Sequence, residues 1–351
     1  MLSKRLRAKL FVLIFGGAIS LVLLTVGGYQ LINFLDSNAF CGKLCHTVMN
    51  PEFATYQVSP HSRVDCVTCH VGSGVNFLVK SKLEGLPQIY YTLTGTYSRP
   101  ITTPVANLRP ARDTCEECHR PEKFVGDWVR FYTNYATDEA NTKTVTAQAL
   151  RIGGGTDLPQ DIHWHIASNV WYLAVDEKLQ DIAWVGVENS DGTLTEWSDP
   201  TKGAEITSKQ IKDGKHLMDC TDCHNRATHI FYSPEELIDD ALEQGTIDGS
   251  LPFIKKEGLS ALDPVNPSLQ NAYDKIDAIN GFYKTNYPLE YTQKIDAINS
   301  AIAELKVIAE LTTFPRMNVN WDTHIDNSGH QEYPGCFRCH GKLVQKNSTA
   351  P

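Results

Sequence analysis

The chain has 351 residues, of which 42% are hydrophobic and 21% are charged, a composition typical of a folded protein with one or two domains. Its formal net charge is −9 and it contains no long run of basic residues, which argues against nucleic acid as a partner. The acidic balance is consistent with a soluble domain that meets basic or neutral surfaces.

The N-terminal segment predicts a membrane anchor. Four basic residues come first: Lys4, Arg5, Arg7 and Lys9. No charged residue occurs from Leu10 to Leu35, and about 20 apolar residues are enough to cross a bilayer. A cleaved signal peptide is the alternative, but its apolar core runs only about 7–15 residues, and no clear small-x-small cleavage site precedes the first cysteine. The basic flank places the N-terminus in the cytoplasm and everything after the anchor outside it.

Four further segments carry secondary-structure signals. Residues 75–94 are expected to form a helix, and residues 163–200, with VWYLAV and IAWVGV before the turn NSDG, are expected to form a small β-element. Ser233 followed by proline predicts a helix N-cap. The sequence KIDAIN occurs at 275–280 and again at 294–299, in two segments with helical spacing of apolar residues. These two segments predict a pair of packing helices.

All ten cysteines lie in five pairs, and a histidine directly follows each pair. The pairs are Cys41/Cys45, Cys66/Cys69, Cys115/Cys118, Cys220/Cys223 and Cys336/Cys339, and the histidines are His46, His70, His119, His224 and His340. A zinc ribbon or a disulfide framework does not need a histidine at this position in every pair. Cys-x-x-Cys-His is the attachment signal of c-type haem, in which two thioethers fix the porphyrin and the adjacent imidazole reaches the iron. The sequence therefore predicts five covalently attached haems.

The first motif departs from this spacing, because three residues separate Cys41 from Cys45. Gly42 is expected to absorb the extra residue, since glycine tolerates unusual backbone angles. Met49 lies about one helical turn after His46, so the two side chains share a face and can hardly bind opposite sides of one iron. Either His46 binds the iron and Met49 packs, or Met49 binds and His46 turns away.

Low-spin electron-transfer haems need a sixth ligand, usually histidine or methionine. Seven histidines remain outside the motifs: His61, His163, His165, His216, His229, His324 and His330. About half to two thirds of them are expected to bind iron, given the demand for axial ligands.

Three parts of the sequence carry a resemblance to a known family: the N-terminal anchor, the segment MNPEFATYQVSPHSRVDCVTCHVGSG at 49–74, and HNRATH at 224–229. Together they resemble the NapC/NirT family of membrane-anchored multihaem quinol dehydrogenases. The resemblance covers roughly residues 1–130 and 216–230. The middle insertion and the fifth motif depart from the short tetrahaem pattern of the family. The regions expected are a cytoplasmic N-terminus (1–9), a transmembrane anchor (10–35), a NapC/NirT-like trihaem region (36–130), an insertion with the β-element (131–215) and a C-terminal dihaem helical region (216–351).

The resemblance implies a particular set of distal ligands. Met49 would bind the first haem, and Lys82, with Lys80 or a histidine as alternatives, would bind the second. His229 would cross to the haem of Cys115/Cys118 and His61 to that of Cys220/Cys223. The fifth haem lies outside the pattern, and its candidates are His163, His165, His216, His324 and His330, with His165 and His330 preferred. A quinol site would combine Met49, Lys82 and Glu84, the only carboxylate on the predicted helix at 75–94.

The expected fold is a mainly α multihaem cytochrome c with one N-terminal transmembrane helix, a small β-element and a haem-packed core with little regular secondary structure. The expected function is transfer of electrons from membrane quinol (menaquinol or ubiquinol) through five haems to a redox partner in the bacterial periplasm. One alternative is a relay subunit of a larger membrane complex without its own quinol site. A terminal reductase is another, but it needs a haem with an open coordination position.

Overall fold

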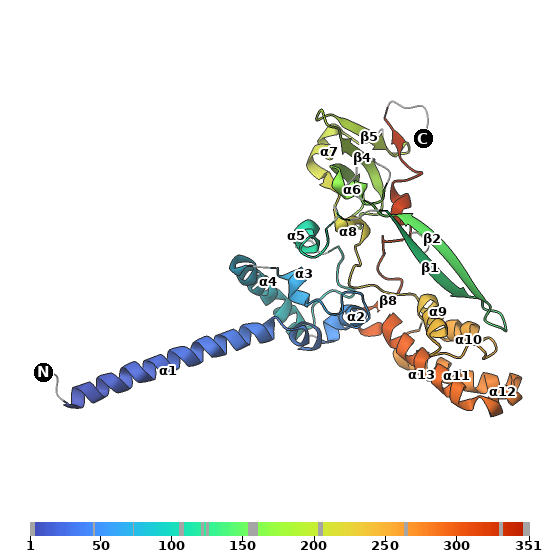
Figure 1. The fold of residues 1–351 in the computed structure, drawn as a ribbon, viewed down its shortest axis with the longest axis horizontal. Helices are drawn as coiled ribbons and strands as arrows, with labels where there is room; N and C mark the ends of the chain where they lie inside the picture. Colours follow the sequence, from blue (N-terminus) through green and yellow to red (C-terminus); the bar gives the residue numbers. More distant parts are fainter. Residues whose placement is uncertain are drawn as a thin grey trace.

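The computed structural model describes residues 4–44, 46–72, 74–104, 109–120, 123, 126–153, 161–202, 206–262, 266–329 and 333–346. A long helix, α1, projects from the body of the protein (Figure 1). In the body, a β-sheet lies at one end and a helical bundle at the other, and a long β-hairpin runs between them (Figure 1).

Helix α1 (Lys4–Leu35) confirms the predicted apolar helix. The most apolar stretch of this helix has a mean hydropathy of 2.5, and the helix is long and apolar enough to cross a membrane. None of its residues is buried against the rest of the chain. The helix begins at Lys4, so the basic residues form its first turns rather than a separate segment.

The segment after α1 is made of short helices that carry the first three motifs. They are the π-helix η1 (Phe40–Leu44), α2 (His46–Gln57), α3 (Cys66–His70), α4 (Val75–Thr94) and α5 (Ala111–Cys115). Helix α4 has the bounds that the sequence predicted. It ends at Gly95, whose φ of 69° is the left-handed conformation that glycine adopts most readily at a helix C-terminus.

A five-stranded antiparallel sheet follows, with strand order β6-β3-β4-β5-β9. Its strands are β3 (Val170–Ala174), β4 (Ile182–Glu188), β5 (Leu194–Ser198), β6 (His216–Leu217) and β9 (Val344–Gln345). The first three confirm the β-element predicted at 163–200. The other two come from distant parts of the chain, so the sheet joins the segments of the fourth and fifth motifs.

The hairpin of β1 (Asp127–Tyr135) and β2 (Lys143–Arg151) was not predicted. Its two strands pair along their whole length, from Asp127 opposite Arg151 to Tyr135 opposite Lys143. A two-stranded ribbon needs further packing to be stable in water. The turn supplies it, because the Asn141 side-chain amide donates to the carbonyl oxygens of Gly249 and Leu251 at 3.0 and 2.8 Å.

The C-terminal bundle has its own aliphatic core. Its helices are α9 (Pro234–Gln244), α10 (Ile254–Ala261), α11 (Leu269–Asn286), α12 (Pro288–Gln293) and α13 (Ile295–Thr312). Ser233 caps α9 as predicted, accepting from the Glu236 N–H. The KIDAIN segments lie in α11 and α13, and their residues Ile276, Ile279 and Ile298 are buried together, which confirms the two packing helices.

This bundle corrects the expectation of a core with little regular secondary structure, while the packing of haems stays a prediction. About half of the chain is helical, and the largest apolar cluster lies in α9–α13, which contain no cysteine. The segment between the fourth and fifth motifs therefore has enough aliphatic residues to fold around its own core. A smaller cluster, with Phe231, Phe314 and Met317, packs against α2 and joins the bundle to the first motifs.

A buried lysine ties the hairpin to the bundle. Lys255 is 1% exposed, and its ammonium lies 2.8 Å from Asp239 and 2.9 Å from Glu235. It also donates to the carbonyl oxygen of Tyr135 in β1. The remaining short elements are α6 (Trp164–Ala167), α7 (Ser208–Gly214), α8 (Cys220–Cys223), β7 (Thr313–Phe314), η3 (Pro315–Met317), β8 (Val319–Asn320) and η4 (Gly335–Arg338).

Candidate functional site

Four of the motif histidines each face a histidine from another part of the chain. The ring centroids lie 6.2 Å apart for His70 and His229, 5.9 Å for His119 and His61, 6.4 Å for His224 and His163, and 5.7 Å for His340 and His165. Two imidazole–metal bonds of about 2 Å, added to the distance from each ring centre to its nitrogen, place two rings roughly 6 Å apart. Each pair therefore has the spacing of two axial ligands on one metal.

The four histidines outside the motifs share a second feature. In each of them Nδ1 lies against a backbone carbonyl: His61 on Ala227 at 2.9 Å, His229 on Glu52 at 2.9 Å, His165 on Ile162 at 2.8 Å, and His163 on Ile152. Because a carbonyl only accepts, Nδ1 carries the proton and Nε2 keeps its lone pair. Metal-binding histidines are usually oriented by such a bond from the other ring nitrogen.

Burial keeps four of the paired imidazoles in the neutral form that binds metal. It lowers the pKa of His70, His224 and His340, and it lowers the pKa of His229 to about 4. A histidine must be deprotonated before it can act as a ligand. At neutral pH these side chains are therefore ready to bind iron.

The facing pairs differ from the crossings that the resemblance implies. His229 faces His70 rather than His119, and His61 faces His119 rather than His224. The reason lies in the backbone contacts, because Glu52 of α2 holds His229 beside α3 while Ala227 holds His61. These contacts join segments that are distant in sequence, so motif spacing gave no signal for them.

The remaining candidates for the fifth haem do not meet a motif histidine among the described residues. His324 is buried against Phe231, with 5.2 Å between the ring centroids. His216 lies against Tyr172 at 5.8 Å. His330 lies outside the described residues. His165 faces His340 and is the candidate that the structure favours.

The motif cysteines differ in how far they are exposed. Of the nine that the structure describes, seven are partly buried, whereas Cys118 of the third motif and Cys336 of the fifth are exposed. The exposure of Cys118 has a local cause, because α5 ends at Cys115 and Cys118 lies in the turn that follows the helix. Attachment of haem at Cys118 stays a prediction.

Consecutive motifs lie beside one another in space. The first and second are joined where the Cys66 N–H donates to the Asn38 side chain at 2.9 Å. The thiols of Cys41 and Cys66 also form a hydrogen bond, which lowers the pKa of Cys41 to about 7 and raises that of Cys66. Helix α3, with the second motif, packs against α5, with the third.

The third and fourth motifs meet where α5 packs against α8. A hydrogen bond between their thiols raises the pKa of Cys115 and lowers that of Cys220. The fourth and fifth meet where the Arg338 guanidinium donates to the Asp222 carbonyl oxygen at 2.6 Å. The five motifs therefore follow one another in space in the order of the sequence.

The first motif accommodates its extra residue in η1. A π-helix has one residue more per hydrogen-bonded turn than an α-helix, and η1 covers Phe40–Leu44. Gly42 is needed for space rather than for an unusual φ, because a Cβ there would lie 2.0 Å from the Phe53 ring. Met49 is half-buried in α2. Cys45 and the His46 side chain lie outside the described residues.

The predicted lysine ligand of the second haem is not supported. His229 occupies the place facing His70. The Lys82 ammonium instead forms an ion pair with Asp36, directly after α1, and lies 3.4 Å from the Leu35 carbonyl oxygen. Lys80 pairs with Glu84 at 3.8 Å on the exposed side of α4. The carboxylate that meets Lys82 is therefore Asp36, not Glu84.

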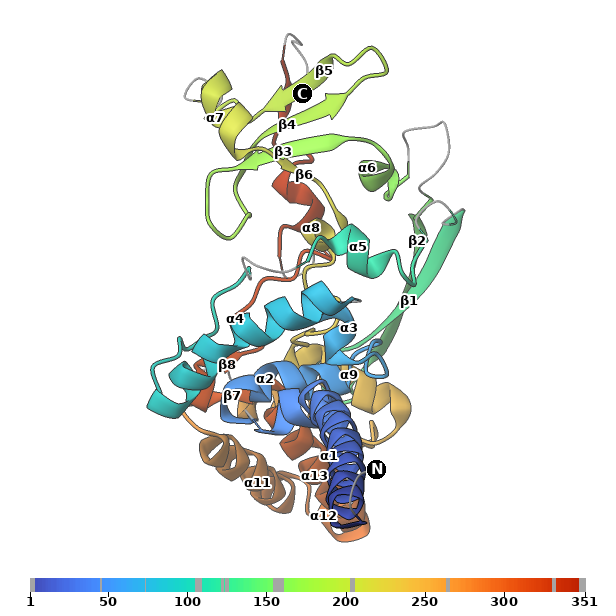
Figure 2. The same ribbon diagram turned by 90° about the vertical axis from the view of Figure 1, so that its left-hand side faces the viewer.

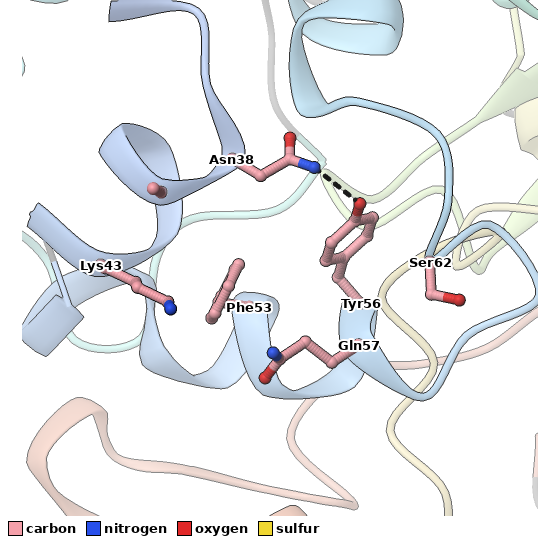
Figure 3. Close-up of a pocket in the computed structure, with 7 residues that line it drawn as sticks. Asn38, Lys43, Phe53, Tyr56, Gln57 and Ser62 are labelled. Carbon is pink, nitrogen blue, oxygen red and sulfur yellow. Dashed lines mark hydrogen bonds between the residues drawn. The ribbon is translucent and has the colours of Figure 1, made fainter. Parts of the chain in front are cut away.

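An open pocket of about 360 Å³ lies between η1 and α2 (Figure 3). Lys43, Phe53 and Gln57 line it, and Asn38 donates to the Tyr56 hydroxyl at 3.0 Å along one wall (Figure 3). It is a shallow depression open to solvent rather than an enclosed cavity. No pattern in the sequence predicted this pocket, because its walls come together only when η1 folds against α2.

Three arginines beside the motifs test whether haem fits. Arg109 and Arg112 precede or begin α5, and Arg226 follows the fourth motif. Each has a buried guanidinium nitrogen with no hydrogen-bond partner in the described part of the chain. Buried guanidinium groups call for anionic partners, and haem carries carboxylates. The paired imidazoles and these arginines therefore fit haem, which supplies one-electron transfer when bound.

Motifs of two cysteines and a histidine, facing imidazoles and an apolar N-terminal helix define a membrane-anchored cytochrome of the c type. A model of the NapC/NirT cytochrome c family, N-terminal region, matches residues 3–104. The chain belongs to the NapC/NirT cytochrome c family, a family of membrane electron-transfer proteins with covalently bound haem, which confirms the resemblance.

Two relatives illustrate how far the similarity extends. The cytochrome c-type protein ImcH of Geobacter sulfurreducens is 42% identical over 354 residues, which cover 97% of this chain and 69% of ImcH. The cytochrome c-type protein NrfH of Wolinella succinogenes is 30% identical over 110 residues, 30% of this chain and 61% of NrfH. No solved structure matches the chain.

Proposed function

We propose that this protein carries electrons from membrane quinol through five haems to a redox partner in the bacterial periplasm. The observation that carries the proposal is the line of motifs. It starts at the end of the membrane helix, and each motif after the first has a facing pair of histidines. Haem neighbours in such a line would pass electrons in sequence order, away from the membrane.

The residues would hold the haems as follows. The ten cysteines would form the thioethers, and the second to fifth haems would have the axial pairs His70/His229, His119/His61, His224/His163 and His340/His165. The first haem would be held by Cys41 and Cys45, with His46 or Met49 as its axial ligand. The protein supplies spacing, ligands and burial, while the redox chemistry belongs to the cofactor.

Quinol would react at the membrane end of this line. Asp36 and Lys82 form an ion pair where α1 ends, and the pocket between η1 and α2 opens beside the first motif. Quinol gives up protons together with its electrons, and a carboxylate such as Asp36 is a suitable proton acceptor. The pocket supplies aromatic and amide side chains that would orient a quinol ring.

The electrons would leave at the opposite end. The fifth motif lies in η4 next to the five-stranded sheet, far from α1 (Figure 1). Cys336 is exposed there, so the edge of its haem would be accessible to a partner. A periplasmic or membrane redox protein is the partner expected at this end.

Two other functions compete with this proposal. A terminal reductase needs a haem with an open coordination position, and the four histidine pairs leave only the first haem for that role. A relay subunit without its own quinol site would share the same line of haems. The proposed quinol-oxidising protein and the relay subunit differ in the source of their electrons, which is quinol for the first and another protein for the second.

Reduction of the haems by quinol tests whether quinol is the source of electrons. The full-length protein, purified and reconstituted in liposomes, is expected to be reduced by a menaquinol or ubiquinol analogue. Lys82→Gln should slow this reduction, while the matched change Lys80→Gln, on the exposed side of α4, should leave it unchanged. Dithionite should reduce all variants fully. If no quinol analogue reduces a protein that dithionite reduces, the relay subunit is the better assignment.

A further inference from the structure

Helix α4 carries an exposed stripe of apolar side chains. Val79, Leu83, Leu86, Tyr90 and Leu93 recur at intervals of four, three, four and three residues, the spacing that places side chains on one face of a helix. Their exposed fractions run from 53% to 82%. We refer to these five residues as the α4 stripe.

The stripe is not the side of α4 that packs on the protein. Leu78, Ser81, Lys82, Gly85 and Thr92 are the less exposed residues of the helix, and they lie on a different face from the stripe. The opposite flank is mixed, because Lys80, Glu84 and Gln88 are exposed there together with the rings of Phe77 and Tyr91. Helix α4 therefore has one partly covered face, one mixed flank and one wholly apolar face with no cover in the described part of the chain.

The membrane anchor determines what medium this apolar face meets. Lys82 of α4 is joined to Asp36 and to the Leu35 carbonyl oxygen, at the last residues of α1. Viewed along α1 from its N-terminal side, α4 extends across the front of the body, and no other described element lies over it (Figure 2). The helix is therefore attached at the point where α1 leaves the membrane, on the side of the body that faces the bilayer.

The chemistry of the stripe suits the interface of a bilayer. Leucine and valine side chains fit the acyl boundary, and a tyrosine ring is favoured at the level of the headgroups. Tyr90 is 63% exposed, and the neighbouring Tyr91 is 47% exposed. Lys80, on the mixed flank, would reach the lipid phosphates.

We propose that α4 is an interfacial helix, which lies in the outer surface of the membrane with the α4 stripe in the acyl boundary. The protein is then held by a spanning helix and by a second helix lying on the surface. This inference rests on the membrane anchoring of the family and does not depend on quinol oxidation. It would also fix the tilt of the body, and with it the depth of the Asp36–Lys82 pair.

The depth of single side chains tests the proposal. Spin labels are placed on the full-length, haem-loaded protein at Leu86→Cys and Leu93→Cys on the stripe, and at Gln88→Cys on the mixed flank as a matched control. The parent protein without a new cysteine controls for background labelling. Each variant is reconstituted in liposomes of phosphatidylcholine and phosphatidylglycerol, and collisions with oxygen and with a water-soluble nickel chelate are measured.

The expected result is an oxygen-to-nickel collision ratio several-fold higher at both stripe positions than at the control, because oxygen concentrates in lipid and the chelate is excluded from it. Equal ratios at all three positions would overturn the proposal, since the stripe would then face water. Protection of the stripe from both reagents would also overturn it, because protein rather than lipid would cover α4. None of these outcomes depends on whether quinol is a substrate.

Discussion

Replacement of His229 by alanine is expected to open one coordination position at the haem of Cys66/Cys69. The His229 ring lies 6.2 Å from that of His70 and is held by the Glu52 carbonyl oxygen. Alanine removes the ring altogether, and among the described residues no other histidine ring contacts His70. The haem at this motif would therefore become five-coordinate and high-spin.

The size of the effect follows from the number of motifs. The change affects the haem of one motif among five, so the dithionite-reduced variant should bind about one more carbon monoxide per protein than the parent. Titration with carbon monoxide, followed in the haem absorption spectrum, measures this increment. Electron paramagnetic resonance of the oxidised protein should show the matching high-spin signal.

Two comparisons make the result specific. His324→Ala and His216→Ala should add no carbon monoxide site, because neither ring faces a motif histidine. In a protein that lacks Cys66 and Cys69, and with them that haem, a further His229→Ala should add no site either. An additional site in that background would show that His229 serves another haem, and an unchanged spectrum of the single variant would refute ligation by His229.

Three further outcomes are expected. Met49→Leu should shift the spectrum and lower the potential of one haem if the thioether binds iron; an unchanged redox titration would assign that ligand elsewhere. Leu305→Ala removes a fully buried side chain from the core of the bundle and should lower the free energy of unfolding by about 2–5 kcal/mol. Leu289→Ala changes an exposed side chain and should alter that free energy by no more than about 0.5 kcal/mol. Denaturant unfolding followed by circular dichroism measures both. Lys255→Ala leaves the buried Asp239 carboxylate unpaired and should destabilise the bundle by about 3–5 kcal/mol in the same assay, and a loss below that of the exposed leucine would contradict the role of the ion pair.

Local signals predicted local structure well. The helix at 75–94, the helix N-cap at Ser233 and the strands of the β-element depend on neighbouring residues, and the structure has each of them. The hairpin of β1 and β2 was missed because its strands are largely exposed on both faces. Such strands lack the alternation of buried and exposed residues that marks a half-buried sheet.

The histidine pairs show where the sequence was insufficient. Cysteine spacing identified the motif histidines, but the partner of each depends on contacts between segments far apart in the chain. The bond from His229 to the Glu52 carbonyl oxygen is one example, and no pattern of residue types encodes it. The exposure of the motif cysteines is a second example, because the spacing of Cys115 and Cys118 did not indicate that Cys118 would lie at the surface. The helix expected at 75–94 was likewise predicted without any indication that its apolar face would lie outside the protein core.

The order of the paired histidines along the chain has a consequence for synthesis. A chain emerges from its N-terminus, so a site can be completed only when its last residue has appeared. His61 precedes His119, His163 precedes His224 and His165 precedes His340, whereas His229 follows His70. At the moment when His224 has emerged, the third and fourth motifs already have both of their histidines, while the second motif, made much earlier, still waits for His229.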